Sequence, residues 1–235
     1  MKNEKDIMVY GVDMQKDFMN KDGALYVPGA EEIKGNIKRI VDAEPDVLVL
    51  SGDKHKPGDK ELEAFPAHCM DGTEGSKFIK EVENFEYDMT IPKRLMELLK
   101  LESPEKYDAI MAGVDDLSSP RWWEHSWLEN GIPFPFCILT KNEVDVFQGN
   151  DKADDIIVAY RKEGIKRAII IGVAIEYCVL AAVLGIQKRG IQCFVVTDAI
   201  AGIDTQAIQD ALGKMTKAGA ILVNTEWAVA ELLQS

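Results

Sequence analysis

The sequence has no apolar run long enough to cross a membrane. Its longest apolar stretches, such as residues 168–173, fall far short of the ~20 residues that a membrane-spanning helix needs. The first residues, MKNEKDIMVYG, also lack the apolar core of a secretory signal peptide. We therefore expect a cytoplasmic protein with no membrane partner.

Positive charge and paired cysteines are scarce as well. The 27 basic residues are outnumbered by 40 acidic residues, and a formal net charge of -13 would repel a phosphate backbone, which argues against nucleic acid as the main partner. The four cysteines are Cys69, Cys137, Cys178 and Cys193, and none has CxxC spacing. The sequence therefore indicates neither a disulfide framework nor a four-sulfur zinc site, and a reduced compartment fits it.

What the sequence does contain is an alternation of short apolar or β-branched runs with longer segments whose apolar residues recur every three or four positions. The expected strands are 7–13, 47–53, 109–114, 136–141, 168–173, 193–198 and 220–224. The expected helices are 30–43, 92–101, 120–130, 152–163, 177–189, 205–217 and 226–233. The strands are almost wholly apolar, which is typical of a sheet covered on both faces. The pattern predicts an α/β fold, a three-layer α/β/α sandwich around a mainly parallel, Rossmann-like sheet.

Length and composition favour one domain over residues 1–235, because 235 residues with 46% hydrophobic content can bury a single sizeable core. The span near 83–135 carries its own expected helices and a cluster of Trp122, Trp123 and Trp127. We expect this span to be an inserted lid or interface segment. Its tryptophans fit core or subunit-interface packing better than substrate contact, and the apolar helices favour a homo-oligomer.

Four of the expected strands end at Asp13, Asp53, Lys141 and Val173. In open parallel sheets, ligands bind beyond the carboxyl ends of the strands. Folding does not require charged residues there, since Gly, Asn or Ser can close a strand equally well. The strand ends therefore predict one shared cleft.

A first chemical motif places two of the three histidines in one short stretch, Ser51-Gly-Asp53-Lys-His55 followed by Phe65-Pro-Ala-His68. An extended Asp-x-His pair projects both side chains to one side, and a later loop can return a third ligand. Asp53, His55 and His68 are thus candidate metal ligands. The alternative is a strand-end aspartate beside two surface histidines.

A second motif, Gly172-Val-Ala-Ile-Glu-Tyr-Cys178, runs from an apolar strand into a helix. Cys178 would lie in the first helical turn, where backbone N–H groups and the helix dipole favour a thiolate and can hold an oxyanion. Ala174 is small enough for close substrate approach. The alternative is a buried cysteine that packs like a small apolar residue.

A third pair consists of Asp13 and Lys141. At neighbouring strand ends the aspartate could accept a thiol proton, while the lysine could stabilise the thiolate. An ordinary ion pair is the alternative.

Taken together and in order, these segments resemble the isochorismatase-like cysteine hydrolases, and most closely the nicotinamidase (pyrazinamidase) branch. The similar segments are DMQKDF at 13–18 with GALYVPGA at 23–30, PAHCMDGT at 66–73, GVAIEYC at 172–178 and TDAIAG at 197–202. Some nicotinamidases have a further histidine shortly after the Asp-x-His pair, and residues 56–60 contain none.

The resemblance implies specific roles. Cys178 would be the nucleophile, Asp13 the general base and Lys141 the third catalytic residue, with oxyanion-hole amides from Ala174 and Cys178. It also implies a cis peptide bond between Val173 and Ala174, and Phe18 and Phe65 at aromatic positions around a pyridine ring, although both could be core residues.

For the cofactor, the resemblance implies one divalent metal ion on Asp53, His55 and His68 that orients the substrate. We expect zinc first, with iron and manganese as alternatives. The implied reaction converts nicotinamide to nicotinate and ammonia through a cysteine thioester, a step of NAD salvage. The alternatives are a related cysteine hydrolase of another small amide, carbamoyl or ureido compound, and a non-catalytic binding member of the fold.

Overall fold

The computed structural model describes residues 6–82 and 136–234, and these residues contain a six-stranded sheet. The strand order is β3-β2-β1-β4-β5-β6, and every neighbouring pair is parallel. The strands are β1 (Ile7–Val12), β2 (Leu48–Asp53), β3 (Phe136–Lys141), β4 (Arg167–Val173), β5 (Gln192–Ala201) and β6 (Ile221–Val223). The predicted parallel sheet is confirmed.

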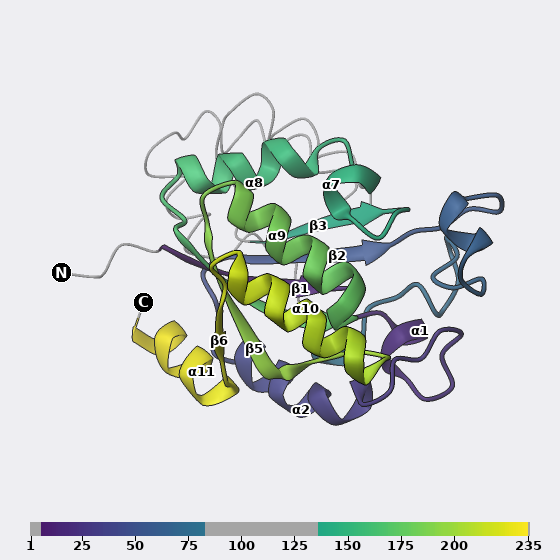
Figure 1. The fold of residues 1–235 in the computed structure, drawn as a ribbon, viewed down its shortest axis with the longest axis horizontal. Helices are drawn as coiled ribbons and strands as arrows, with labels where there is room; N and C mark the ends of the chain where they lie inside the picture. Colours follow the sequence, from purple (N-terminus) through teal and green to yellow (C-terminus); the bar gives the residue numbers. More distant parts are fainter. Residues whose placement is uncertain (1–5, 83–135, 235) are drawn as a thin grey trace, which may run out of the picture. The chain divides into compact units, whose positions relative to one another are not determined.

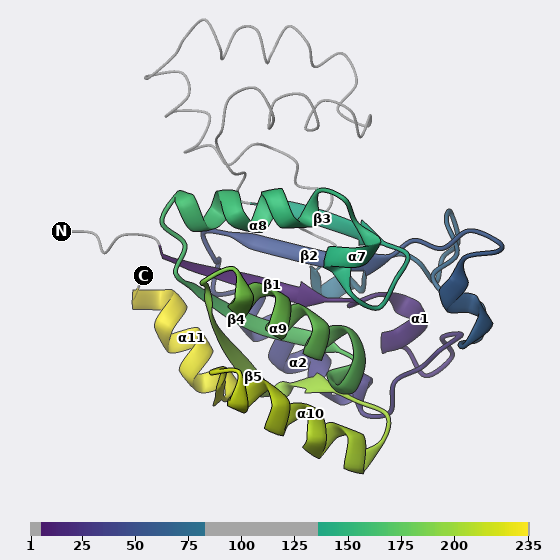
Figure 2. The same ribbon diagram turned by 45° about the horizontal axis from the view of Figure 1, so that its top comes forward.

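Helices cover both faces of this sheet (Figures 1 and 2). One layer holds α2 (Ala30–Val41) and α11 (Thr225–Gln234), and the opposite layer holds α8 (Ala153–Lys162), α9 (Leu180–Lys188) and α10 (Thr205–Lys217). All residues of β1 and β2 are buried, as expected for a central parallel sheet whose strands lack alternation. The predicted three-layer α/β/α architecture is therefore present.

Three short helical segments in the loops were not anticipated from the sequence pattern. They are α1 (Lys16–Met19), the 3₁₀ helix η1 (Lys60–Glu63) and α7 (Val146–Gly149). Each spans four residues, too few for an apolar period of 3.6 to become visible. A fourth segment, the π-helical turn η2 (Ile175–Val179), overlaps the start of the expected helix 177–189.

Two expected boundaries were wrong. The helix expected at 177–189 begins earlier, as η2, because the Ala174 carbonyl accepts from the amides of both Tyr177 and Val179 at 3.1 Å. The strand expected to end at Asp198 continues to Ala201 as part of β5, past a register shift relative to β4. Asp198 does not end the strand, because β5 pairs again with β4 beyond it, Ile200 with Gly172 and Ala201 with Val173. The Asp198 side chain accepts from the Thr225 amide at 2.8 Å, at the start of α11.

The expected strand 109–114, the expected helices 92–101 and 120–130 and the three tryptophans all lie outside the described residues. They remain expectations. No helix in the described ranges is both long and apolar enough to span a bilayer.

The topology places a ligand site between β1 and β4, where the strand order reverses direction. At this point the backbones of β1 and β4 approach each other closely. Gly172 of β4 has φ 115°, and a Cβ atom there would meet the Val12 carbonyl oxygen on β1. Only glycine combines this backbone conformation with so close an approach. The ends of β1 and β4 are thereby held side by side, directly before Asp13 and Ala174.

Candidate active site and metal centre

Four polar side chains converge at the carboxyl ends of the first four strands. Asp13 follows β1, Asp53 ends β2, Lys141 ends β3, and Cys178 lies in η2 after β4. All four are buried, with exposed fractions of 1%, 2%, 2% and 8%. Buried charges are costly unless they are paired, so their mutual contacts determine what the site can do.

Lys141 connects the other three residues. Its Nζ lies 2.9 Å from Asp13 Oδ2, donates a hydrogen bond to Asp53 Oδ1 and lies 3.5 Å from Cys178 Sγ. Asp13 is also tied to β2, since its amide donates to the Ser51 carbonyl at 2.9 Å. Its φ of 48° lies in the left-handed region, which non-glycine residues rarely adopt and which is frequent at functional sites. The structure thus brings Asp13, Lys141 and Cys178 into one cluster.

The ionisation of this cluster places a carboxylate beside a protonated thiol. Burial raises the pKa of Asp13 to about 6, although the Lys141 charge opposes that shift. Burial and the charge of Asp13 raise the pKa of the Cys178 thiol well above its ordinary value. Burial lowers the pKa of Lys141, but the surrounding negative charges outweigh it and raise that pKa well above normal. Near neutral pH the cluster therefore holds a thiol, a carboxylate base and an ammonium group.

The turn that carries Cys178 has the backbone that the resemblance implies. The peptide bond between Val173 and Ala174 is cis, and Ala174 adopts an extended conformation before η2 begins. Ala174 and Cys178 both line a pocket at this end of the sheet.

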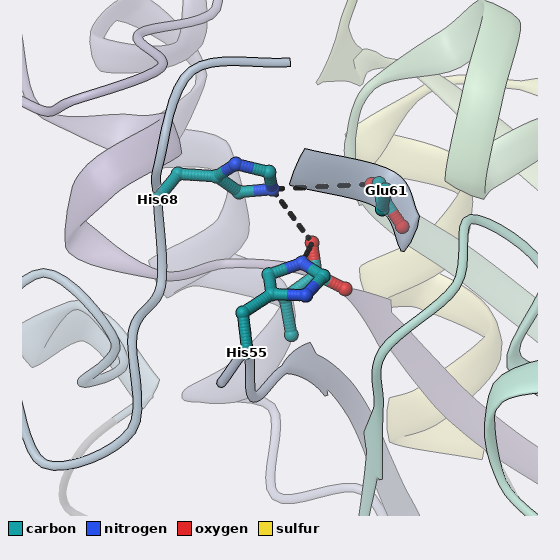
Figure 3. Close-up of side chains that lie close together, drawn as sticks. His55, Glu61 and His68 are labelled. Carbon is teal, nitrogen blue, oxygen red and sulfur yellow. Dashed lines mark ion pairs between the residues drawn. The ribbon is translucent and has the colours of Figure 1, made fainter. Parts of the chain in front are cut away.

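A second cluster lies on the other side of Asp53. Asp53, His55, Glu61 and His68 are all buried, and each offers one candidate ligand atom within 4.8 Å of the others. His68 Nε2 lies 3.4 Å from Asp53 Oδ2 and 3.9 Å from Glu61 Oε1, and His55 Nε2 lies 3.7 Å from Asp53 Oδ2. Figure 3 shows the labelled side chains of His55, Glu61 and His68 facing a common point. The sequence predicted three members of this cluster and missed Glu61.

The residues of this cluster fit a divalent cation. Within the part of the chain that the structure describes, Asp53 Oδ2, His55 Nε2, Glu61 Oε2 and His68 Nε2 are buried and have no hydrogen-bond partner. Four unsatisfied acceptor groups in one place are costly unless a cation satisfies them. Two imidazoles and two carboxylates are ligands that zinc, iron and manganese accept.

Hydrogen bonds behind these residues orient them. His68 Nδ1 lies 2.7 Å from the Pro66 carbonyl oxygen, and His55 Nδ1 lies 3.4 Å from Asp59 Oδ2, so both rings present Nε2 to the cluster. Burial raises the pKa of Asp53, but the Lys141 charge and the two histidines outweigh it and hold that pKa well below normal. Asp53 is therefore an anion that faces Lys141 with one oxygen and the histidines with the other.

The Gln15 side chain holds the backbone of Asp53 in place through hydrogen bonds. Its Oε1 accepts from the Asp53 amide at 2.7 Å, and its Nε2 donates to the carbonyl oxygens of Asp53 at 2.8 Å and Ser76 at 2.7 Å. Asp17 holds the loop that carries His68 in the same way, because its Oδ2 accepts a hydrogen bond from the amide of the next residue, Cys69, at 2.7 Å. Two polar residues of the loop after β1 therefore fix the backbone that carries Asp53 and His68.

The pocket above these clusters is largely apolar. Phe18 and Phe65, the two aromatic residues anticipated from the sequence, both line it. Their rings lie 5.2 Å and 6.4 Å from the His68 ring, and Phe65 also meets Tyr177 edge-to-face at 5.5 Å. Lining residues that the sequence did not single out are Leu25, Val27, Glu61, Val144, Tyr177 and Ile203. No Lys or Arg side chain is among the described residues that line the pocket.

Three comparisons with known proteins bear on this site. Residues 133–226 match the model of the isochorismatase domain family. A comparison of the sequence with curated proteins found no significant match.

Solved structures resemble the whole fold at low identity. Pyrazinamidase of Pyrococcus horikoshii in complex with zinc has a TM-score of 0.62 at 23% identity, covering 93% of this chain and 99% of that one. PnC1 from L. infantum in complex with nicotinate has a TM-score of 0.67 at 16% identity, covering 94% of each chain. N-carbamoylsarcosine amidase from Thermoplasma acidophilum has a TM-score of 0.62 at 21% identity, covering 94% and 96%. The fold is that of the isochorismatase-like hydrolases, and the family match over residues 133–226 agrees with the resemblance to these hydrolases that the sequence motifs indicate.

Proposed function

We propose that this isochorismatase-like chain is a metal-assisted cysteine amidase that converts nicotinamide to nicotinate and ammonia. The observation that carries the proposal is the shared carboxylate of Asp53, which contacts Lys141 through Oδ1 and faces the two histidines through Oδ2. The nucleophile cluster and the candidate metal cluster therefore form one site. We further propose a cytoplasmic homo-oligomer that serves pyridine nucleotide salvage.

The chemistry begins at Cys178. Asp13 takes the thiol proton, and Sγ attacks the carboxamide carbon while Lys141, 3.5 Å away, stabilises the negative charge on sulfur. The amides of Ala174 and Cys178 hold the developing oxyanion. The C–N bond then breaks, Asp13 returns the proton to the leaving nitrogen, and ammonia departs from a thioester.

Water completes the cycle. Asp13 accepts one proton from a water molecule while the water oxygen attacks the thioester carbon. The C–S bond breaks, Asp13 passes this proton to the Cys178 thiolate, and the product forms as a carboxylic acid. The acid then loses its own proton to solvent and becomes a carboxylate next to the Lys141 ammonium. A divalent metal bound by Asp53, His55, Glu61 and His68 would supply a Lewis-acid position for the ring nitrogen of the substrate.

The lining of the pocket favours a flat aromatic amide over a ureido compound without a ring. Phe18, Phe65 and Tyr177 offer ring faces and edges to a flat substrate. Nicotinamide has such a ring, and N-carbamoylsarcosine does not.

An ammonia-release assay on the metal-loaded protein tests this proposal. We expect release from nicotinamide and pyrazinamide, with kcat/KM for benzamide lower by about 10- to 100-fold, because benzamide has the same shape without the ring nitrogen. N-carbamoylsarcosine should be a poor substrate. Hydrolysis of the ureido compound with none of nicotinamide would instead favour the related carbamoyl hydrolase, and no hydrolysis of any amide would favour the non-catalytic binding member.

The pH profile should report the state of Asp13. The base must be ionised and its pKa is raised to about 6, so activity is present above that pH and is lost as the pH falls through it. We expect kcat/KM for nicotinamide to fall about tenfold per pH unit below about pH 6, measured in buffers of constant ionic strength. An acid limb centred near pH 4, the ordinary range of a carboxyl group, would contradict this role of Asp13.

A further inference from the structure

Glu176 lies two residues before Cys178, in the turn η2, and its carboxylate binds the loop that follows β5. Its Oε1 accepts hydrogen bonds from the amides of Ile203, at 2.7 Å, and Asp204, at 2.8 Å. These two residues belong to the loop between β5 and α10. One carboxylate oxygen thus ties the nucleophile turn to a loop from another strand.

The other carboxylate oxygen is enclosed by the same loop. Glu176 Oε2 is buried without a hydrogen-bond partner among the described residues, and a Cβ atom at Gly202 would lie only 2.5 Å from it. Gly202 therefore leaves the space that this carboxylate fills. An enclosed carboxylate oxygen without a partner is unfavourable in itself, so the contact persists because the two amide hydrogen bonds and the helix end stabilise it.

The start of α10 provides that electrostatic support. Asp204 caps the helix, with Oδ1 accepting from the Ala207 amide at 2.8 Å, and α10 spans 13 residues. The partial positive charge at a helix N-terminus favours a nearby anion. Glu176 is therefore held in a defined orientation against the loop.

Because Glu176 binds the backbone of Ile203, it also fixes the position of the Ile203 side chain. This isoleucine is 44% exposed and lines the pocket together with Tyr177 and Cys178. Its amide is one of the two that Glu176 binds. An exposed apolar side chain at a fixed place on the pocket wall suits contact with an apolar part of the substrate.

We propose that Glu176 is a positioning residue that fixes Ile203 as a wall of the pocket, and thereby sets the affinity for the substrate and the size of the molecules that reach Cys178. Glu176 does not itself line the pocket. This inference rests on the proposed function in one respect: it assumes that an amide substrate binds next to Cys178.

Steady-state kinetics of Glu176→Ala, Ile203→Ala and the double variant test the inference. If Glu176 acts through Ile203, each single variant should raise KM about tenfold with kcat within about threefold, and the double variant should be no worse than either single one. Glu176→Gln should keep a KM close to wild type, because its amide oxygen can accept both hydrogen bonds. Additive effects on KM, or a loss of kcat at unchanged KM, would overturn the inference.

Alkylation of Cys178 without substrate separates this inference from the proposed function. We would measure the rate of Cys178 alkylation by mass spectrometry of the peptide that contains it. The two reagents are iodoacetamide, which is small, and N-phenylmaleimide, which is bulky. Glu176→Ala should speed the bulky reagent selectively by about tenfold, since a released Ile203 no longer narrows the entrance, and Glu176→Gln should not. An unchanged ratio of the two rates would contradict the inference. If wild-type protein hydrolyses no amide, the proposed function fails, and the alkylation ratio still decides the role of Glu176.

Discussion

Replacing Cys178 by alanine is expected to lower kcat for nicotinamide hydrolysis by at least about 10⁴-fold, because no other group can form the thioester. Cys193→Ala is the matched control. Cys193 is also buried, but its Sγ lies near the carbonyl oxygens of Val183 and Ile191, and it does not line the pocket. The control should keep kcat within about threefold, measured by ammonia release and corrected for any loss of folded protein by circular dichroism.

The triad should also behave as one unit. Asp13→Asn should lower kcat severely, and adding it to Cys178→Ala should cost little more, because residues that act in the same step are strongly non-additive. The fold itself should survive these changes. Independent, additive losses would show that Asp13 acts elsewhere than on the Cys178 proton, and substantial activity in Cys178→Ala would refute the thioester mechanism.

The sequence predicted the sheet well because parallel strands buried on both faces have an apolar pattern that few other structures produce. The segments that became β1, β2 and β4 illustrate this, with nearly every residue buried. Where the prediction failed, a polar residue had a local partner that the pattern cannot show. Asp198 was taken as a strand end, yet its carboxylate binds the start of α11 while β5 continues.

For the site, the sequence identified the charged residues at strand ends and the histidines His55 and His68, and it missed Glu61. Asp13, Asp53 and Lys141 were anticipated because a charged residue that closes an apolar run is conspicuous. Glu61 was missed because KELE at 60–63 looks like an ordinary solvated turn, and the pattern does not distinguish Glu61 from Glu63. Only the 3₁₀ helix turns Glu61 inward while Glu63 remains exposed.

Asp53 is the residue on which chemistry and metal binding both depend. If the Asp53 carboxylate moves relative to Lys141, the position of its second oxygen relative to His55 and His68 changes as well. A substitution at Asp53 would therefore confuse metal loss with damage to the nucleophile cluster. The metal site is better tested at Glu61 and His68, for which the structure gives no contact with Lys141 or Cys178 and which leave that cluster intact.

We expect the wild-type protein to bind one divalent ion per chain, and His68→Ala to lose stoichiometric binding. Glu61→Gln should weaken metal binding by at least about 100-fold, because it removes a ligand. Loss of a residue that only hydrogen-bonds to a ligand typically weakens metal binding by ~10- to 100-fold. Glu63→Gln is the matched control, since it makes the same chemical change two residues away at an exposed position. Metal content after dialysis, measured by mass spectrometry, gives the direct result.

Thermal unfolding provides a second measurement that does not depend on catalysis. A metal present at about 100 times its Kd should stabilise the folded wild-type protein and the Glu63→Gln control by about 2.7 kcal/mol, and should stabilise His68→Ala hardly at all. Unchanged metal content in His68→Ala would refute the assigned cluster. Wild-type affinity in Glu61→Gln would remove Glu61 from the ligand set and leave the three residues that the sequence predicted.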